Sequence, residues 1–118
     1  MYYLIMSDSI FTKIKNKEIP GNIIHEDDIC FAIEDINPQA PVHVLIIPHK
    51  EIDKVSNASH EDISILGHLL LVSKKIAAKY NLNDNYRLTI NNGAEAGQSV
   101  FHIHVHLLGG RSLSWPPG

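Results

Sequence analysis

The sequence lacks the features that mark several classes of protein. Cys30 is the only cysteine among 118 residues, which excludes an intrachain disulfide, and its apolar flanks favour a buried strand thiol. No stretch approaches the roughly 20 apolar residues of a membrane span, and the apolar run 2–6 is too short for a signal peptide. The chain has ten basic and thirteen acidic residues, for a formal net charge of −3. We therefore expect a cytoplasmic protein that binds neither nucleic acid nor membranes.

Hydrophobic residues make up 44% of the chain and charged residues 19%, which is an ordinary balance for one globular domain. Apolar periodicity predicts a short helix over residues 9–17 and a long helix from about 59 to 80, for which Ser59 and Asp62 form a plausible capping pair. Strands are predicted over 22–26, 29–36, 42–47, 86–91 and 100–108. This order of elements favours an α+β fold with a largely antiparallel sheet.

The feature with the clearest chemical meaning is the run His-Ile-His-Val-His over residues 102–106. In a strand, alternate side chains share a face, so the three imidazoles are predicted to lie together. Random placement of eight histidines gives such a triplet only about 0.03 times. Three interpretations compete: a solvated strand face, a zinc or copper site, and an imidazole nucleophile that attacks phosphorus.

The loop before the histidines helps to separate these interpretations. Residues 91–99 are rich in small residues, which let backbone N–H groups approach an anion closely. Their only acid is Glu95, whereas a divalent metal site would more naturally place carboxylates there. The surroundings therefore favour a phosphate ligand, although similar loops are usually simple turns.

With the chain's ending Trp115-Pro116-Pro117-Gly118 added, the sequence resembles the histidine triad (HIT) family, and within it the Hint branch of adenosine 5′-phosphoramidases and purine nucleoside phosphoramidate hydrolases. The resemblance implies a single domain over 9–118 behind an extension of residues 1–8. It implies a mainly antiparallel five-stranded sheet with one short and one long helix, which dimerises into a continuous ten-stranded sheet. It also implies cleavage of an AMP–amine P–N bond through a nucleotidyl-histidine, without metal or cofactor.

The resemblance assigns roles to particular residues. It makes His104 the nucleophile, oriented by an Nδ1–H bond to the carbonyl of His102, and it places His106 on the phosphate with His43 beside the triad. Ser99 lies near the leaving amine, Asp35 accepts the ribose hydroxyls, and Trp115 reaches the leaving-group side of the partner's site. The phosphate cradle comprises Asn91, Gly97 and Gln98. The apolar wall around the purine comprises Ile10, Phe11, Ile14, Ile33, Ile36 and Leu45. Without the resemblance, Asp35 fits a surface turn, the wall residues fit an ordinary core, and Trp115 fits a packing anchor.

The sequence departs from some relatives in one respect. Those relatives hold a structural zinc ion with Cys-x-x-Cys and two histidines, whereas Ser9, Thr12 and Glu51 stand here, so we predict no zinc. The remaining histidines, His25, His49, His60 and His68, match no family site and are predicted to be surface or helix-face residues. Two other activities stay open: hydrolysis of a diadenosine polyphosphate, and a non-catalytic nucleotide-binding or scaffold dimer.

Overall fold

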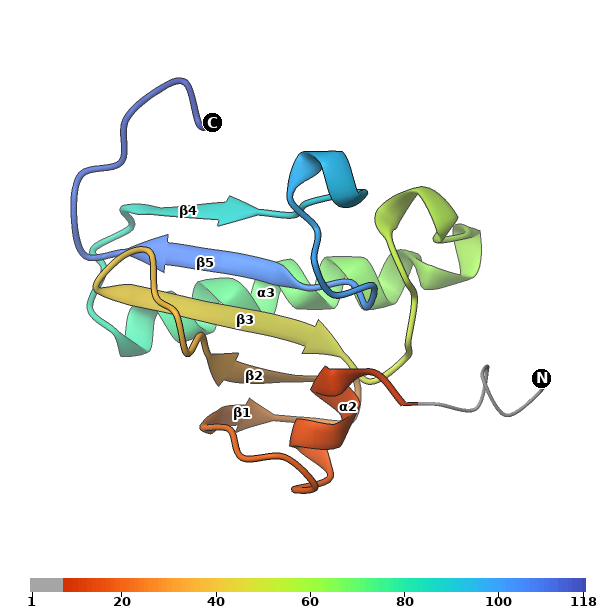
Figure 1. The fold of residues 1–118 in the computed structure, drawn as a ribbon. Helices are drawn as coiled ribbons and strands as arrows, with labels where there is room; N and C mark the ends of the chain where they lie inside the picture. Colours follow the sequence, from red (N-terminus) through yellow and green to blue (C-terminus); the bar gives the residue numbers. More distant parts are fainter. Residues whose placement is uncertain (1–7) are drawn as a thin grey trace.

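The computed structural model describes residues 8–118, so the predicted extension 1–8 lies outside the described residues except for Asp8. Five strands form one antiparallel sheet in the order β1–β2–β3–β5–β4 (Figure 1). The elements are α2 (Ile10–Lys15), β1 (Ile23–Glu26), β2 (Cys30–Glu34), β3 (Val42–Pro48), α3 (Ile63–Lys79), β4 (Tyr86–Thr89) and β5 (Val105–Gly109), with 3-10 turns η1 (Val55–Asn57), η2 (His60–Asp62) and η3 (Ala94–Ala96). The predicted α+β class with an antiparallel sheet is confirmed.

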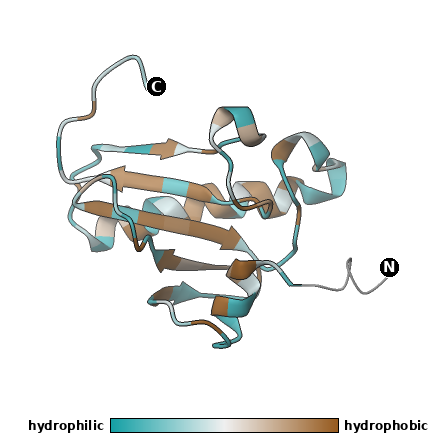
Figure 2. Cartoon of the chain, viewed as in Figure 1, coloured by the Kyte–Doolittle hydropathy of each residue, from teal (hydrophilic) through white to brown (hydrophobic). Residues whose placement is uncertain are grey.

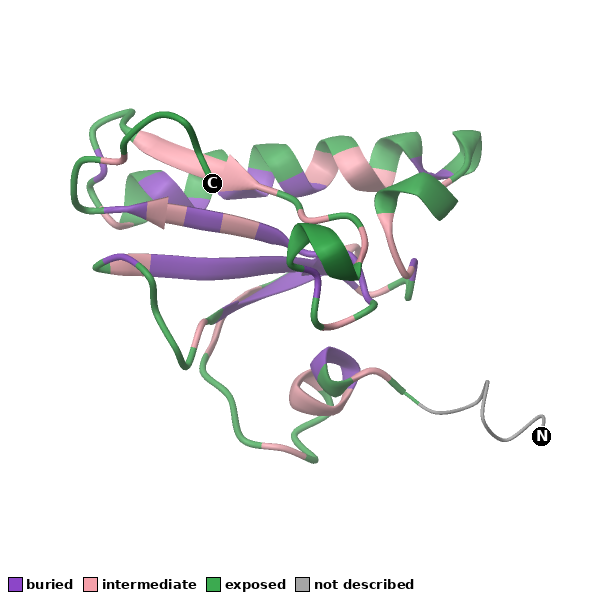
Figure 3. Cartoon of the chain, turned by 45° about the horizontal axis from the view of Figure 1, so that its top comes forward, coloured by how far each residue is buried: buried purple, intermediate pink, exposed green. Residues whose placement is uncertain are grey.

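The two helices cover opposite faces of the sheet (Figures 1 and 3). On the α3 face, Leu69, Val72 and Ile76 pack against alternate residues of β3 and β5. On the α2 face, Phe11 packs with residues of β2 and β3, among them Ile33 and Leu45. Because β3 is central and covered on both sides, it is apolar and buried almost throughout (Figure 2).

The long helix begins as the sequence predicts, but through a 3-10 turn. The Ser59 N–H donates to Oδ2 of Asp62 at 2.9 Å, and the two residues form a capping box around η2. Nζ of Lys50 lies 2.6 Å from the other oxygen of the same carboxylate. The α-helix therefore starts at Ile63 and runs for 17 residues. No helix within residues 8–118 is long and apolar enough to cross a membrane.

The last strand is shorter than predicted. The expected strand over 100–108 is wrong for residues 100–104, because β5 begins only at Val105. The N–H of Ile103 donates to the carbonyl of Ile52 at 2.7 Å, so this segment is bonded to the chain that follows β3 instead of to a neighbouring strand. The other predicted elements are present, with ends that differ by at most four residues.

Candidate active site

Three histidine rings meet on the α2 face of the sheet. His43 lies on β3, His106 on the neighbouring β5, and His104 just before β5. The ring centroids of His104 and His106 are 4.8 Å apart, and those of His43 and His106 are 5.2 Å apart. The structure thus brings together the predicted nucleophile and two of its predicted neighbours.

Backbone geometry sets the tautomer of His104. Its Nδ1 lies 2.8 Å from the carbonyl oxygen of His102, and because a carbonyl only accepts, Nδ1 must carry the proton. This is the contact that the family resemblance implies. Nε2 has no hydrogen-bond partner among residues 8–118, and it is not one of the fully buried unpartnered atoms there. The Nε2 lone pair of His104 is therefore unprotonated and reaches solvent.

A second chain of hydrogen bonds sets the tautomer of His106. The N–H of Gln39 donates to Nδ1 of His43 at 3.0 Å, which leaves the proton of His43 on Nε2. The Nε2–H of His43 donates to Nδ1 of His106 at 2.9 Å, and Oδ2 of Asp35 lies 3.4 Å from Nε2 of His43. His106 must then carry its own proton on Nε2. The site presents one imidazole lone pair, on His104, beside one imidazole donor, on His106.

These imidazoles are neutral at physiological pH. Burial lowers the pKa of His104 below its ordinary value of 6.5. Burial, together with the neighbouring His104 and His43, lowers the pKa of His106 to about 4. Burial also lowers the pKa of His43, against the opposing effect of Asp35. Neutral rings are what the derived tautomers require, since a protonated His104 would have no lone pair.

His102 is a fully buried side chain that joins this region to α2. Its Nε2–H donates to the carbonyl of Pro48 at 2.7 Å, so its Nδ1 accepts a hydrogen bond from the hydroxyl of Ser9. The ring of Phe11 meets His104 edge-on, with centroids 4.9 Å apart. His102 therefore has a positioning role between α2 and the reactive ring, and its side chain does not face the site opening.

The positions that hold zinc in some relatives are also brought together. Thr12 donates to Oε2 of Glu51 at 2.8 Å, next to the Ser9–His102 hydrogen bond. Two hydroxyls, a carboxylate and one imidazole are a poor donor set for Zn²⁺, which prefers thiolate and imidazole ligands. The residues present do not fit that ion, and their hydrogen bonds to one another connect α2 to the rest of the site.

Asp35 lies beside the histidines at the end of β2. Its Oδ1 accepts the N–H of Asn37 at 2.8 Å, while Oδ2 faces His43. A cavity of about 230 Å³ beside Asp35 and His43 extends to Tyr80, which follows α3, and neither His104 nor His106 lines it. Asp35, His43 and His106 also place one ligand atom each within 4.8 Å of one another, so these three are the active-site residues with metal-binding geometry.

The loop before the histidines is held open by two glycines in conformations that L residues rarely adopt. Gly93 has φ of 97° and Gly97 has φ of 100°. Gln98 is buried, and its side chain accepts the N–H of Gly93 and donates to the carbonyls of Asp53 and Val100. The side chain of Gln98 therefore holds the loop in shape, and its predicted place in the phosphate cradle stays a prediction.

Two further residues of this loop remain available to a ligand. The hydroxyl of Ser99 is exposed and has no hydrogen-bond partner within the described part of the chain. Asn91 is half-buried, and its side-chain nitrogen lies 3.5 Å from the position that a Cβ on Gly97 would take. The predicted contacts of both residues with a phosphate stay predictions.

The predicted apolar wall is present in part. Phe11, Ile33 and Leu45 belong to one buried cluster on the histidine face, and Ile14 packs against it. Ile10 and Ile36 do not belong to this cluster, since Ile10 is half exposed and Ile36 is 95% exposed. Ile36 directly follows β2 and the turn at Asp35, where no neighbouring element covers it.

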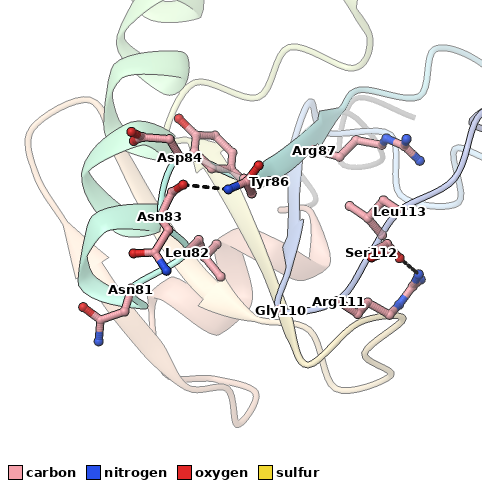
Figure 4. Close-up of a pocket in the computed structure, with 11 residues that line it drawn as sticks. Asn81, Leu82, Asn83, Asp84, Tyr86, Arg87, Gly110, Arg111, Ser112 and Leu113 are labelled. Carbon is pink, nitrogen blue, oxygen red and sulfur yellow. Dashed lines mark hydrogen bonds between the residues drawn. The ribbon is translucent and has the colours of Figure 1, made fainter.

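Trp115 lies away from the histidines of its own chain. Its side chain is 80% exposed, and the segment before it is held by a 2.7 Å hydrogen bond from Arg87 of β4 to the carbonyl of Ser114. A cavity of about 630 Å³ also lies at this end of the molecule, between residues 81–87 and 110–113 (Figure 4). This cavity contains no histidine and is distinct from the candidate active site.

The HIT domain family model matches residues 16–113. This chain belongs to the HIT domain family. The HIT protein is 59% identical to an uncharacterised HIT-like protein of Synechocystis over 94% of its own length and 97% of the relative's. It is 44% identical to the crystal structure of a HIT family hydrolase from Legionella pneumophila, covering 94% and 100% of the two chains with a TM-score of 0.90. A histidine triad nucleotide-binding protein from Candida albicans is 34% identical, covers 92% and 83%, and has a TM-score of 0.78.

The structure adds residues to this HIT protein's site that sequence patterns did not assign. The N–H of Gln39 fixes the tautomer of His43, and Ser9 holds His102. A backbone N–H leaves no signal in a sequence. Ser9 lies 93 positions from His102, so only the resemblance to a zinc-binding position indicated that the two are neighbours.

Proposed function

We propose that this HIT protein hydrolyses purine nucleoside 5′-phosphoramidates, such as AMP amides, through a covalent nucleotidyl group on Nε2 of His104. The observation that carries the proposal is the pair of fixed tautomers, a lone pair on His104 beside a donor on His106. The hydrolase named in the Legionella structure and the nucleotide-binding protein named in the Candida structure support this class of activity.

The first chemical step follows from these tautomers. Nε2 of His104 attacks phosphorus in line with the P–N bond, and the bond electrons leave with the amine nitrogen. That nitrogen takes one proton from solvent, relayed by the hydroxyl of Ser99. Nε2–H of His106 donates to a phosphoryl oxygen where negative charge develops, which stabilises the transition state. The carbonyl of His102 stabilises the imidazolium that forms on His104.

The second step restores the enzyme. Water attacks the same phosphorus, the P–N bond to His104 breaks, and one proton returns to solvent. The nucleoside monophosphate then leaves, so the net reaction consumes one water and releases one amine. Asp35 would accept the ribose hydroxyls, and the cluster of Phe11, Ile33 and Leu45 would contact the purine.

The proposal extends to a homodimer, in which the exposed Trp115 approaches the leaving-group side of the partner's site. Two observations support it. An indole that is 80% exposed in one chain has a large apolar surface without cover, and its segment is fixed along β4, the edge strand of the sheet. A second copy that pairs along this edge would extend the sheet and cover the indole.

Trapping of the intermediate tests the proposed chemistry. The protein is mixed with adenosine 5′-phosphoramidate, quenched in alkali and weighed by intact mass spectrometry. We expect an adduct with the mass of a nucleotidyl group, which is absent in His104→Ala and retained in His60→Ala, whose histidine is exposed on η2. Turnover by His104→Ala should fall by about 10⁴-fold or more.

The same experiment separates the alternatives. Binding of AMP without any adduct in the unsubstituted protein would refute the enzyme and favour a nucleotide-binding scaffold. Faster turnover of a diadenosine polyphosphate than of the phosphoramidate would assign the nucleophile to a different leaving group.

A further inference from the structure

A second group of metal-ligating side chains lies at the turn between β1 and β2. His25 belongs to β1, Asp27 follows that strand, and Cys30 is the first residue of β2. His68 reaches the same point from α3. The sequence predicted His25 and His68 as separate surface or helix-face residues, because nothing in their spacing shows that α3 crosses this turn.

One carboxylate oxygen is the centre of the group. Oδ2 of Asp27 lies 2.8 Å from Nε2 of His25, 2.8 Å from Nε2 of His68 and 3.6 Å from Sγ of Cys30. The ligand atoms of His25, Asp27 and Cys30 all lie within 4.8 Å of one another. The second oxygen, Oδ1, accepts the N–H groups of Ile29 and Cys30 at 2.8 Å each, which fixes the orientation of the carboxylate.

The arrangement of these atoms fits coordination of a metal cation better than a set of hydrogen bonds. A carboxylate oxygen has two lone pairs, yet two N–H groups and one S–H group point at this one. Around a tetrahedral Zn²⁺ ion with bonds of about 2.0–2.3 Å, the ligand atoms lie about 3.3–3.7 Å from one another. The distances from Oδ2, 2.8 to 3.6 Å, already approach that range. His68 lies outside the group of three whose ligand atoms are within 4.8 Å of one another, so rotation of its side chain above all would open a position for an ion.

We propose that His25, Asp27, Cys30 and His68 form a binding site for Zn²⁺ or a similar divalent transition metal. Two imidazole nitrogens, one thiolate and one carboxylate oxygen form a ligand set that favours such an ion over Mg²⁺ or Ca²⁺. On binding, the thiol of Cys30 loses its proton to solvent, and each imidazole moves its proton from Nε2 to Nδ1. The site has no vacant position for a substrate, so its role is structural.

The surroundings agree with an ion that enters from solvent. The side chains of His25, Asp27 and His68 are 17%, 29% and 31% exposed, whereas Cys30 lies buried beneath them. Burial and the charge of Asp27 raise the pKa of Cys30 to about 12. The thiol is therefore protonated without an ion and loses its proton when it binds a metal.

This proposed metal site is separate from the candidate active site and from the hydrogen-bonded residues beside α2. It shares no residue with the histidines 43, 104 and 106, and none with the hydrogen-bonded set of Ser9, Thr12, Glu51 and His102. Since its ligands come from β1, β2 and α3, a bound ion would connect the edge of the sheet to the long helix. The inference does not depend on the proposed phosphoramidase activity.

Cobalt(II) is a suitable probe, because thiolate ligation produces a strong sulfur-to-metal charge-transfer absorption. Cys30 is the only cysteine, so this absorption can arise from no other residue of the chain. Titration of metal-free protein with Co²⁺ should saturate at one ion per chain with the charge-transfer band, and Zn²⁺ should displace the cobalt. His25→Asn and His68→Asn should each weaken binding by about 100-fold.

Two variants serve as controls. His60→Asn removes an exposed histidine outside the group and should leave the titration unchanged. His106→Asn removes one member of the other metal-ligating group, so the charge-transfer band should persist. Cobalt binding without that band, or a band of unchanged affinity in both His25→Asn and His68→Asn, would overturn the proposal. The histidine variants keep the test decisive if Cys30→Ser fails to fold.

Discussion

Replacement of Gly97 by alanine tests whether the loop before the histidines needs its left-handed glycine. Gly97 ends η3 with φ of 100° and ψ of 7°, and its N–H donates to the carbonyl of Ala94 at 3.0 Å. A Cβ there would meet the side chain of Asn91 only at 3.5 Å, which is ordinary contact. The cost of Gly97→Ala is therefore backbone strain without a steric clash.

That strain can be given a size. A residue with Cβ at such a positive φ costs about 1–3 kcal/mol. Unfolding entropy near 60 °C is about 2.1 cal/mol/K per residue, so the melting temperature of this chain should change by about 4 °C for each kcal/mol. We expect Gly97→Ala to melt about 4–12 °C lower than the unsubstituted protein. We also expect kcat/KM for the phosphoramidate to fall by about 10-fold or more, because the loop shifts relative to His104.

Gly67 offers the matched control. It is exposed in the interior of α3, and a Cβ on it would meet nothing within 4 Å. The same chemical change there should raise stability by about 0.5–1 kcal/mol, since alanine favours a helix over glycine. Differential scanning calorimetry and initial rates on both variants suffice. A melting temperature for Gly97→Ala at or above that of the unsubstituted protein would refute the strain argument.

Three other predictions concern the site and the edge strand β4. Because burial lowers the pKa of His104 below 6.5, kcat/KM should be constant above pH 6.5 and should fall at more acidic pH. A pH–rate profile in which kcat/KM already falls with a midpoint above pH 6.5 would contradict this. Because these pKa values are lowered in the folded state, the unfolded chain binds more protons than the folded chain below pH 6.5. The free energy of unfolding should therefore fall as the pH falls from 6.5 toward about 4, the pKa of His106. Denaturant titrations at several pH values can measure this fall. Sedimentation equilibrium should give the mass of a dimer, and Trp115→Ala should raise KM about 5-fold for phosphoramidates of large amines while leaving the unsubstituted amide unchanged. A monomer, or equal KM changes for both substrates, would argue against the shared site.

The sequence predicts the fold well where local patterns decide it. The β-branched run 42–47 became the central strand β3, and the capping pair Ser59 and Asp62 does precede the long helix. The strand predicted to begin at residue 100 failed for a tertiary reason. The carbonyl of Ile52, about 50 positions earlier, takes the N–H of Ile103, and period-two alternation cannot reveal such a partner.

The candidate site likewise combines features that local sequence patterns predict with features that only the fold creates. The triplet 102–106 and the HIT resemblance predict the candidate site, and the structure places His43 and Asp35 beside the histidines, whereas the position of Ser99 near the leaving amine stays a prediction. Ile36 lies outside the buried cluster because no element covers its turn, and its predicted contact with the purine stays a prediction. Asp27 lies only two and three positions from His25 and Cys30, but His68 lies 41 positions away, so the fold alone brings this fourth side chain to the turn.

The hydrogen bond from the Gln39 N–H to His43 has a consequence for control of the chemistry. This single peptide group determines which nitrogen of His43 holds a proton, and through it which nitrogen of His106 does. If residues 37–39 withdrew, His43 could exchange tautomers, and His106 would then offer a lone pair where a hydrogen-bond donor is needed. The electronic character of the pocket is thus governed by the position of one surface loop, without any change in the identity of a side chain.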